Sequence, residues 1–288
     1  MYDYDVMKYD LKKINPVATE IYSIGKSVMG REIYCLKTGR GDKKLVLTGA
    51  HHGLEYITSK FLMMYIQEYN KCLMLGSNLL DSQAENIFLN VTLYIIPMVN
   101  PDGVDIAVNG IDITNEFHRR LISKVGIHSF RKVWQANGNG VDINHNYDAM
   151  WQNVINNPSP TKYGGKYPES EPETKAICDF LRKEKPDVLI CFHSQGKEIY
   201  YDFDGLAAER AVEVANAMAE AGDYKVCQPK DTATFGGCKD WFIKEFGNMG
   251  FTVEMGRGIN PLSADLAYEL YEENAALVMA SINSLINS

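Results

Sequence analysis

Four short, almost continuously apolar runs constrain the fold of this chain most strongly. They are KKLVLTGA (43–50), VTLYIIPMV (91–99), DVLICFHS (187–194) and GFTVEMG (250–256). A strand has such an unbroken apolar sequence when both faces of its sheet are covered. Longer segments with helical periodicity lie between or after these runs, at 54–73, 169–185, 205–222 and 263–286. The alternation predicts an α/β fold with a mixed, mostly parallel central sheet and helices on both faces.

Composition and charge exclude several other classes of protein. The chain has 288 residues, 45% hydrophobic and 23% charged, which is typical of a globular protein and not of a disordered, collagen-like or coiled-coil one. At this length a single α/β domain covering residues 1–288 is expected. The net charge is −8, so no broad cationic surface is available, and neither nucleic acid nor an anionic membrane is an expected partner.

The amino-terminal segment and the cysteines bear on the compartment. MYDYDVMKYDLKKINP lacks a basic segment followed by an apolar one, and no run approaches the ~18 apolar residues that a membrane-spanning helix needs. We therefore expect a soluble, cytoplasmic protein. The six cysteines have no CxxC spacing, so buried reduced thiols are expected in place of disulfides or a sulfur metal site.

The segment 103–168 differs from the rest of the chain in composition. It is rich in Asn and Gly and has weak periodicity. We expect long loops there, over one edge of the sheet, and long loops in a compact domain are usually functional. His118 and His128 fall in this segment and are expected to be surface groups.

Three of the six histidines lie near the ends of predicted strands. His51 and His52 follow the run 43–50, and His193 lies near the end of 187–194. Ligands bind to open α/β sheets outside the carboxyl ends of the strands, so these side chains should converge. The spacing of His52 and Glu55 at a strand-to-helix turn lets both face one cation, and His193 could be the third ligand. Two histidines and one glutamate with a position open to water form a catalytic zinc site.

The same spacing also has an ordinary explanation. His-x-x-Glu occurs by chance, and each histidine would then be an exposed or hydrogen-bonded side chain. Two carboxylates favour the zinc site. Glu254 lies in an otherwise apolar predicted strand, where an ionisable group is costly unless it is paired or functional. Asp142, in GVDINHNYD, could orient a ligand imidazole from behind.

A series of motifs resembles the zinc metallocarboxypeptidase superfamily. The motifs are GAHHGLE (49–55), NPDGV (100–104), NGVDINHNYD (139–148), YPESEPET (167–174), FHSQ (192–195), GGCKDWF (236–242) and TVEMG (252–256). They occur in the order of that family and, with IGKSVMGREIYCLKTG (24–39), extend the resemblance over nearly the whole chain. The segments HSQGKEIYY (193–201), KDWF (239–242) and EMGRGINPL (254–262) are most similar to the bacterial γ-D-glutamyl-L-diamino acid peptidases. Those enzymes cut the bond from the D-Glu γ-carboxyl to diaminopimelate in cell-wall peptides.

The resemblance implies a role for several residues. His52, Glu55 and His193 match the zinc ligands, and Glu254 matches the general base that activates the zinc-bound water. Zinc lowers the pKa of its water toward ~7, and a neighbouring carboxylate can pass the proton to the leaving amine. Asn144 matches a residue that binds the substrate carboxylate.

Other positions depart from the family pattern. His145 stands where carboxypeptidases have Arg beside the carboxylate-binding Asn, and it is a weaker, pH-dependent clamp. Gln135 falls at the oxyanion position that is usually basic, where a neutral amide contributes less charge stabilisation. Arg131 or Lys132 could compensate. Thr232 aligns with the mobile tyrosine of the digestive members, so no phenol acid is expected there.

The resemblance places Lys239 at the floor of the pocket for the side chain after the cleaved bond. A cation there favours a substrate with an acidic distal group, such as the second carboxylate of diaminopimelate. Asp240 could meet the ammonium of the same group. The ordinary alternative is a solvated Lys–Asp pair at the start of a helix.

Three functions follow from these observations. The leading hypothesis is a zinc peptidase that acts on small peptidoglycan-derived peptides containing D-Glu and diaminopimelate. A second is a zinc carboxypeptidase that removes acidic C-terminal residues, with Lys239 reading the side chain. A third is a binding protein that keeps the zinc pocket without turnover, as Gln135 and His145 suggest. Glu254 argues against the third, because a binding module needs no general base.

Overall fold

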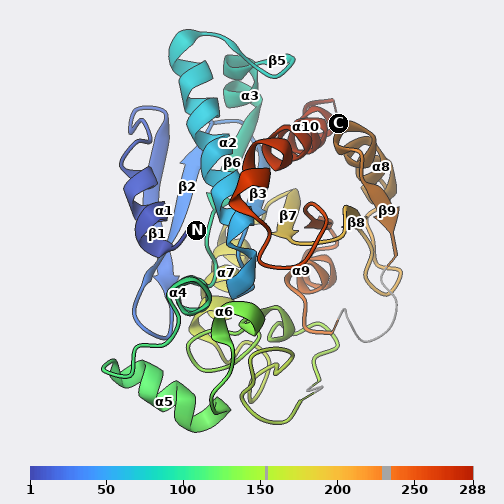
Figure 1. Cartoon of the computed structure of the whole chain (residues 1–288). Helices are drawn as coiled ribbons and strands as arrows, with labels where there is room; N and C mark the ends of the chain where they lie inside the picture. Colours follow the sequence, from blue (N-terminus) through green and yellow to red (C-terminus); the bar gives the residue numbers. More distant parts are fainter. Residues whose placement is uncertain (153–154, 229–234, 288) are drawn as a thin grey trace.

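An eight-stranded sheet forms the centre of the protein in the computed structural model (Figure 1). The structure describes residues 1–152, 155–228 and 235–287. The strands of the central sheet are β1 (Thr19–Lys26), β2 (Glu32–Thr38), β3 (Lys43–Thr48), β6 (Val91–Ile96), β7 (Val188–His193), β8 (Glu198–Tyr200), β9 (Lys225–Cys227) and β10 (Met249–Glu254). Their order is β1-β2-β6-β3-β7-β10-β8-β9, and β4 (Asn78–Leu79) and β5 (Ser82–Gln83) form a separate pair.

The four predicted strands are the middle of this sheet. β6, β3, β7 and β10 are consecutive neighbours and run parallel to one another. β8 and β9 are also parallel, whereas β1–β2, β2–β6 and β10–β8 are antiparallel. The mixed, mostly parallel sheet is therefore as expected. Because the middle strands are parallel, their carboxyl ends meet at one edge, where a ligand site is expected.

Helices cover both faces of the sheet (Figure 1). The four predicted helices are α2 (Tyr56–Leu75), α7 (Pro172–Glu184), α8 (Ala211–Gly222) and α10 (Ala267–Ile286). Other helical segments include α1 (Tyr4–Leu11), α3 (Ala84–Asn90), α9 (Cys238–Phe246) and the 3₁₀ turn η4 (Ala264–Leu266). Members of α1, α2, α8 and α10 pack on one face, and α7 and α9 pack on the other.

Alternating side chains of each middle strand enter two separate cores. Leu45 and Leu47 of β3 pack with residues of α2 and α10, whereas Val46 packs with residues of α7 and α9. All three are fully buried. Since successive side chains of a strand point to opposite faces, a strand covered on both sides needs apolar residues at every position. This explains the unbroken apolar runs of the sequence.

The prediction of loops over 103–168 is partly wrong. The segment contains most of α4 (Pro101–Asn109), together with α5 (Glu116–Val125), α6 (Phe130–Val133) and the 3₁₀ turn η2 (Ile143–His145). Two asparagines, Asn115 within this segment and Asn100 just before it, are helix caps. The side chain of Asn100 accepts the N–H of Gly103, and that of Asn115 accepts the N–H of Phe117. Such caps satisfy N–H groups that the first turn of a helix leaves unpaired.

Two further observations concern the histidines and cysteines. His118 is buried on α5, where its Nδ1 accepts the N–H of Asp112 at 3.0 Å, so its assignment to the surface is wrong. His128 is exposed as expected.

None of the six cysteines forms a disulfide with another, and five of them are buried. Among the described residues, no helix is both long and apolar enough to cross a membrane.

Candidate active site

Three candidate ligands are positioned by the ends of β3 and β7. β3 is followed by residues 49–51 and then by His52, and the 3₁₀ turn η1 (Gly53–Glu55) carries Glu55. A Cβ on Gly53 would stand 2.3 Å from the carbonyl oxygen of Gly103, so only glycine lets η1 approach α4 this closely. His193 is the last residue of β7, the parallel neighbour of β3.

The two imidazoles converge on one carboxylate. His52 Nδ1 lies 2.8 Å from Glu55 Oε1, and His193 Nδ1 lies 3.0 Å from Glu55 Oε2. One ligand atom from each residue lies within 4.8 Å of the other two. Burial opposes ionisation of Glu55, but the two imidazoles outweigh this effect and hold its pKa at about 2. Glu55 is therefore a carboxylate at neutral pH.

Asp142 supports His52 from the other side of its ring. Asp142 Oδ1 lies 3.2 Å from His52 Nε2, and Oδ2 accepts the backbone N–H of Lys162 at 2.9 Å. Burial opposes ionisation here too, but His52 and His145 lower the pKa of Asp142 below its usual range. A carboxylate on the outer nitrogen fixes the tautomer and orientation of a ligand histidine. This contact leaves Nδ1 of His52 for a metal ion.

The donor set fits a zinc ion. Two imidazole nitrogens and one carboxylate oxygen are the protein ligands of a common catalytic zinc site with an open position. In the part of the chain that the structure describes, His52, Glu55 and His193 are the group of side chains close enough to hold a metal. His51 is not in this group: its ring stacks on that of His193 at 5.4 Å, and its Nε2 lies 3.2 Å from the hydroxyl of Tyr147.

Glu254 ends β10 directly beside the ligands. It is paired in register with His193 of β7. Burial is the main reason why the pKa of Glu254 is raised to about 7; His193 opposes this increase and Glu55 adds to it. A carboxyl group whose pKa is near neutral can both accept and return a proton.

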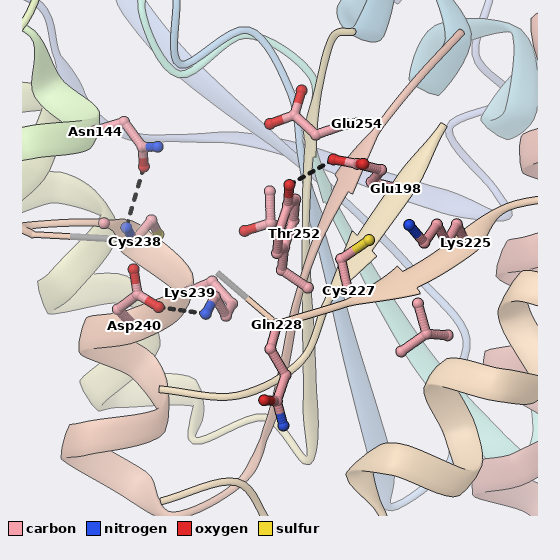
Figure 2. A pocket seen from close by; sticks show the side chains of 13 residues that line it. Asn144, Glu198, Lys225, Cys227, Gln228, Cys238, Lys239, Asp240, Thr252 and Glu254 are labelled. Atoms are coloured by element: carbon pink, nitrogen blue, oxygen red, sulfur yellow. Dashed lines mark hydrogen bonds and ion pairs between the residues drawn. The ribbon is translucent and has the colours of Figure 1, made fainter. Parts of the chain in front are cut away.

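A cavity of about 720 Å³ lies beside Glu254. Its walls come from β8, β9, β10, the start of α9 and the segment that carries Asn144 (Figure 2). The lining residues are Asn144, Glu198, Tyr200, Lys225, Val226, Cys227, Gln228, Gly237, Cys238, Lys239, Asp240, Thr252 and Glu254. The cavity is thus lined by several charged groups, which suits a polar ligand.

Lys239 and Asp240 line the cavity but contact each other. Lys239 Nζ forms an ion pair with Asp240 Oδ1 and donates to the carbonyl oxygen of Asp202 at 2.5 Å. Each residue is only 4% exposed, so the alternative of a solvated pair is wrong. The helix start was correctly foreseen, because both residues lie in the first turn of α9. The sequence pattern does not reveal the burial, since it depends on the sheet beneath the helix.

Asn144 and His145 lie side by side in η2 but have different surroundings. Asn144 Oδ1 accepts the N–H of Cys238 at 3.1 Å, so its amide NH₂ is the group left for a ligand in the cavity (Figure 2). His145 Nδ1 donates to the carbonyl oxygen of Phe235 at 2.9 Å, and its Nε2 lies 4.0 Å from Asp142 Oδ2. His145 is not among the described residues that line the cavity.

The candidates for the oxyanion position, Gln135, Arg131 and Lys132, differ in their surroundings. The backbone carbonyl of Gln135 accepts the N–H of Gly53 at 3.1 Å, which holds this residue against η1. Arg131 is exposed and donates to the carbonyl oxygen of Asn109, so its guanidinium is bound at the end of α4 and the suggestion that it compensates is not supported. Lys132 is also exposed. Thr232 lies outside the described residues.

The cavity is also lined by three residues for which the sequence predicts no role: Glu198, Tyr200 and Lys225. They belong to β8 and β9, strands of three residues each. Strands this short give too few alternations for a periodicity to be recognised. The one available signal is the order polar–apolar–polar in Glu198–Tyr200, which places both polar side chains on one face.

The fold and the site together define a class of protein, the zinc metallopeptidases. The family model described as zinc carboxypeptidase, Peptidase_M14, matches residues 5–275. The chain therefore belongs to the Peptidase_M14 zinc carboxypeptidase family, as the motifs led us to expect.

Individual proteins are similar to this chain in sequence or in fold. The chain is 31% identical over 287 residues to gamma-D-glutamyl-L-diamino acid endopeptidase 1 of Lysinibacillus sphaericus, covering 98% of this chain and 72% of that protein. It is 30% identical over 292 residues to YqgT of Bacillus subtilis (strain 168), an uncharacterized protein, covering 98% and 77%. The crystal structure of thrombin activatable fibrinolysis inhibitor superposes with a TM-score of 0.77 at 20% identity, covering 99% of this chain and 73% of that one.

Proposed function

We propose that this zinc peptidase hydrolyses the bond between the γ-carboxyl of D-Glu and diaminopimelate in small peptides derived from peptidoglycan. The observation that carries the proposal is the position of Glu254, which ends β10 between the ligand group and the charged cavity. The name of the Lysinibacillus sphaericus relative supports the choice of bond. A cytoplasmic location is part of the proposal and agrees with six cysteines that form no disulfide with one another.

The chemistry divides between the metal and the side chains. Zinc, when bound by His52, Glu55 and His193, supplies a Lewis acid that activates water and polarises the carbonyl. Glu254 takes a proton from the attacking water as the oxygen bonds to the carbonyl carbon. The same carboxyl returns the proton to the nitrogen as the carbon–nitrogen bond breaks. The products are a peptide ending in D-Glu and a free amine on diaminopimelate.

Two neutral side chains complete the proposed site. The amide NH₂ of Asn144 donates to a carboxylate of the substrate, because Cys238 already occupies its oxygen. Gln135 donates to the oxyanion, a role that a positioned amide can fill. The structure gives His145 a carbonyl partner in Phe235, so in this proposal it shapes η2 and does not clamp the terminal carboxylate.

The carboxypeptidase alternative is weakened by the pairing of Lys239. Recognition of an acidic C-terminal side chain requires a cation whose charge is available. Lys239 is already bound to Asp240 and to a carbonyl oxygen. A buried ion pair opened to admit a second carboxylate leaves Asp240 without its partner, which is costly.

The proposal is tested with defined peptides and product analysis by mass. The zinc-loaded protein is incubated with L-Ala-γ-D-Glu-diaminopimelate, with the same peptide extended by D-Ala, and with an α-linked peptide ending in L-Glu. We expect the first two to yield L-Ala-D-Glu, with the extended peptide releasing diaminopimelyl-D-Ala as one fragment. Cleavage of the α-linked peptide alone, or removal of only the terminal D-Ala, would refute the proposed bond.

A further inference from the structure

We propose that Glu198 and Lys225 recognise the distal end of the residue after the cleaved bond, Glu198 its ammonium and Lys225 its carboxylate. This inference rests on the proposed function and names the group that the cavity selects. It assigns the recognition to the edge strands β8 and β9, whereas the sequence had suggested Lys239 and Asp240.

The register of the sheet puts these side chains in one row with the catalytic carboxylate. Glu254 is the partner of His193 on one side and of Glu198 on the other, and Glu198 is in turn the partner of Lys225. Partners in register point to the same face of a sheet. The row therefore starts at a metal ligand, passes through Glu254 and continues outward to a carboxylate and an ammonium.

The neighbouring row confirms which face is involved. Phe192, Val253 and Ile199 are partners across β7, β10 and β8, and all three are buried in the core on the opposite face. The alternate residues, including Glu254 and Glu198, must face the side that α9 covers. Figure 2 shows Glu254, Glu198 and Lys225 on one side of the cavity and Asn144, Cys238 and Asp240 on the other.

The spacing of the row matches the length of the substrate. Neighbouring strands lie about 4.8 Å apart, so Glu198 is about one strand spacing from Glu254 and Lys225 about two. The amine released by hydrolysis lies on one stereocentre of diaminopimelate. The other stereocentre is four carbon–carbon bonds away and bears both an ammonium and a carboxylate. An extended side chain of this length brings the second centre to Glu198 and Lys225.

The charges of Lys225 and Glu198 are more available to a ligand than those of Lys239 and Asp240, which form an ion pair with each other. Lys225 is exposed at the cavity, and no ion-pair partner is found for its ammonium among the described residues. Glu198 is partly buried, and the hydroxyl of Tyr200 donates to its Oε2 at 2.5 Å. This hydrogen bond orients the carboxylate before a ligand arrives. Lys239, in contrast, is already neutralised.

One positive and one negative group together select a zwitterion. An acidic side chain would be attracted by Lys225 but repelled by Glu198, and a lysine side chain would meet the reverse. Specificity often comes from such unfavourable contacts with the wrong ligand as well as from favourable ones with the right ligand. The row therefore favours diaminopimelate over glutamate or lysine at this position.

The test compares three peptides that differ in one distal group. The diaminopimelate peptide is L-Ala-γ-D-Glu-meso-diaminopimelate; the lysine peptide lacks the distal carboxylate, and the 2-aminopimelate peptide lacks the distal amine. Values of kcat/KM are measured for zinc-loaded wild type, Lys225→Met, Glu198→Gln and the control Lys175→Met, an exposed lysine on α7. Circular dichroism and zinc content confirm that each variant is folded and loaded.

We expect Lys225→Met and Glu198→Gln each to reduce a different discrimination between peptides. Lys225→Met should lower the preference for the diaminopimelate peptide over the lysine peptide by about three- to tenfold, since its ammonium is exposed. Glu198→Gln should lower the preference over the 2-aminopimelate peptide by about tenfold or more, since its carboxylate is partly buried. Lys175→Met should leave both ratios unchanged.

Other outcomes separate this inference from the proposed function. Unchanged ratios in Lys225→Met and Glu198→Gln, with all peptides still cleaved, would overturn the inference alone. Lys239→Met is measured with the same peptides; a change in the lysine-peptide ratio in this variant but not in Lys225→Met would return the recognition to α9 and also overturn the inference. Failure of the wild type to cleave any of the peptides would refute the proposed function.

Discussion

The position of Glu254 in its strand determines both the free-energy cost of burying its carboxylate and the chemistry that the group can perform. It lies in a strand whose other side chains are largely apolar and buried, and this burial raises its pKa to about 7. An ionisable group in such a place must be compensated or functional. The sequence therefore identifies Glu254 from its apolar neighbours alone, whereas Lys239 and Glu198 have no such context.

Replacement of Glu254 by Gln tests its role as general base. The amide keeps the shape of the side chain but cannot accept a proton from water. We expect kcat to fall by about 10²–10⁴-fold or more, with zinc content unchanged. The control is Glu220→Gln, which makes the same change at an exposed position on α8. A Glu254→Gln enzyme that keeps a tenth or more of the normal activity would point to another base.

Strands and helices differ in how well the sequence predicts them. β3, β6, β7 and β10 were predicted because both of their faces are buried, which leaves a continuous apolar signal. β8 and β9 were missed because three residues at the sheet edge give no pattern. α5 was missed because its cap, Asn115, lies in a segment with the composition of a loop. Consequently the candidate metal ligands could be predicted, whereas the part of the cavity wall that β8 and β9 form could not.

A buried polar network connects α7 to the segment between β1 and β2. Glu173 Oε1 accepts the N–H of Val28 at 3.0 Å, and Oε2 accepts Asn137 Nδ2 at 3.0 Å. Asp102 of α4 is close by and is paired with Arg31 at 2.7 Å. Burial and, to a smaller extent, the charge of Asp102 raise the pKa of Glu173 to about 8.

This pKa predicts how stability depends on pH. Between the ordinary value near 4.5 and about 8, native Glu173 holds a proton that the unfolded chain has lost. The free energy of unfolding should therefore fall as pH rises through this window, by at most about 1.4 kcal/mol per pH unit. Glu173→Gln cannot lose a proton, so its stability relative to wild type should increase from pH 5 to pH 8.

Urea unfolding of the metal-free proteins at pH 5, 6.5 and 8 measures this difference, because removal of zinc eliminates the pH dependence of metal binding. Glu220→Gln again serves as the exposed control, and its free energy of unfolding should change with pH as that of wild type does. A constant difference between Glu173→Gln and wild type at all three pH values would show that Glu173 is already ionised in the native protein.

At the scale of the whole molecule, sheet order brings distant parts of the chain to one edge. His193 and Glu254 end β7 and β10, and His52 follows β3 after three further residues, although the three are far apart in sequence. The rule that sites form at the carboxyl ends of parallel strands predicted their meeting without the order of the strands. The placement of β8 and β9 beyond β10 required the three-dimensional structure, and it adds the charged row to the site.

Metal stoichiometry tests whether His52, Glu55 and His193 form a zinc site at this edge of the sheet. Metal-free wild type, His52→Ala and His51→Gln are loaded with Zn²⁺, exposed to a mild chelator and analysed for metal per chain, with circular dichroism as the check on folding. We expect about one zinc per chain in wild type and His51→Gln, and loss of most of the metal in His52→Ala, because three protein ligands are needed. Retention of stoichiometric zinc by folded His52→Ala would contradict the account.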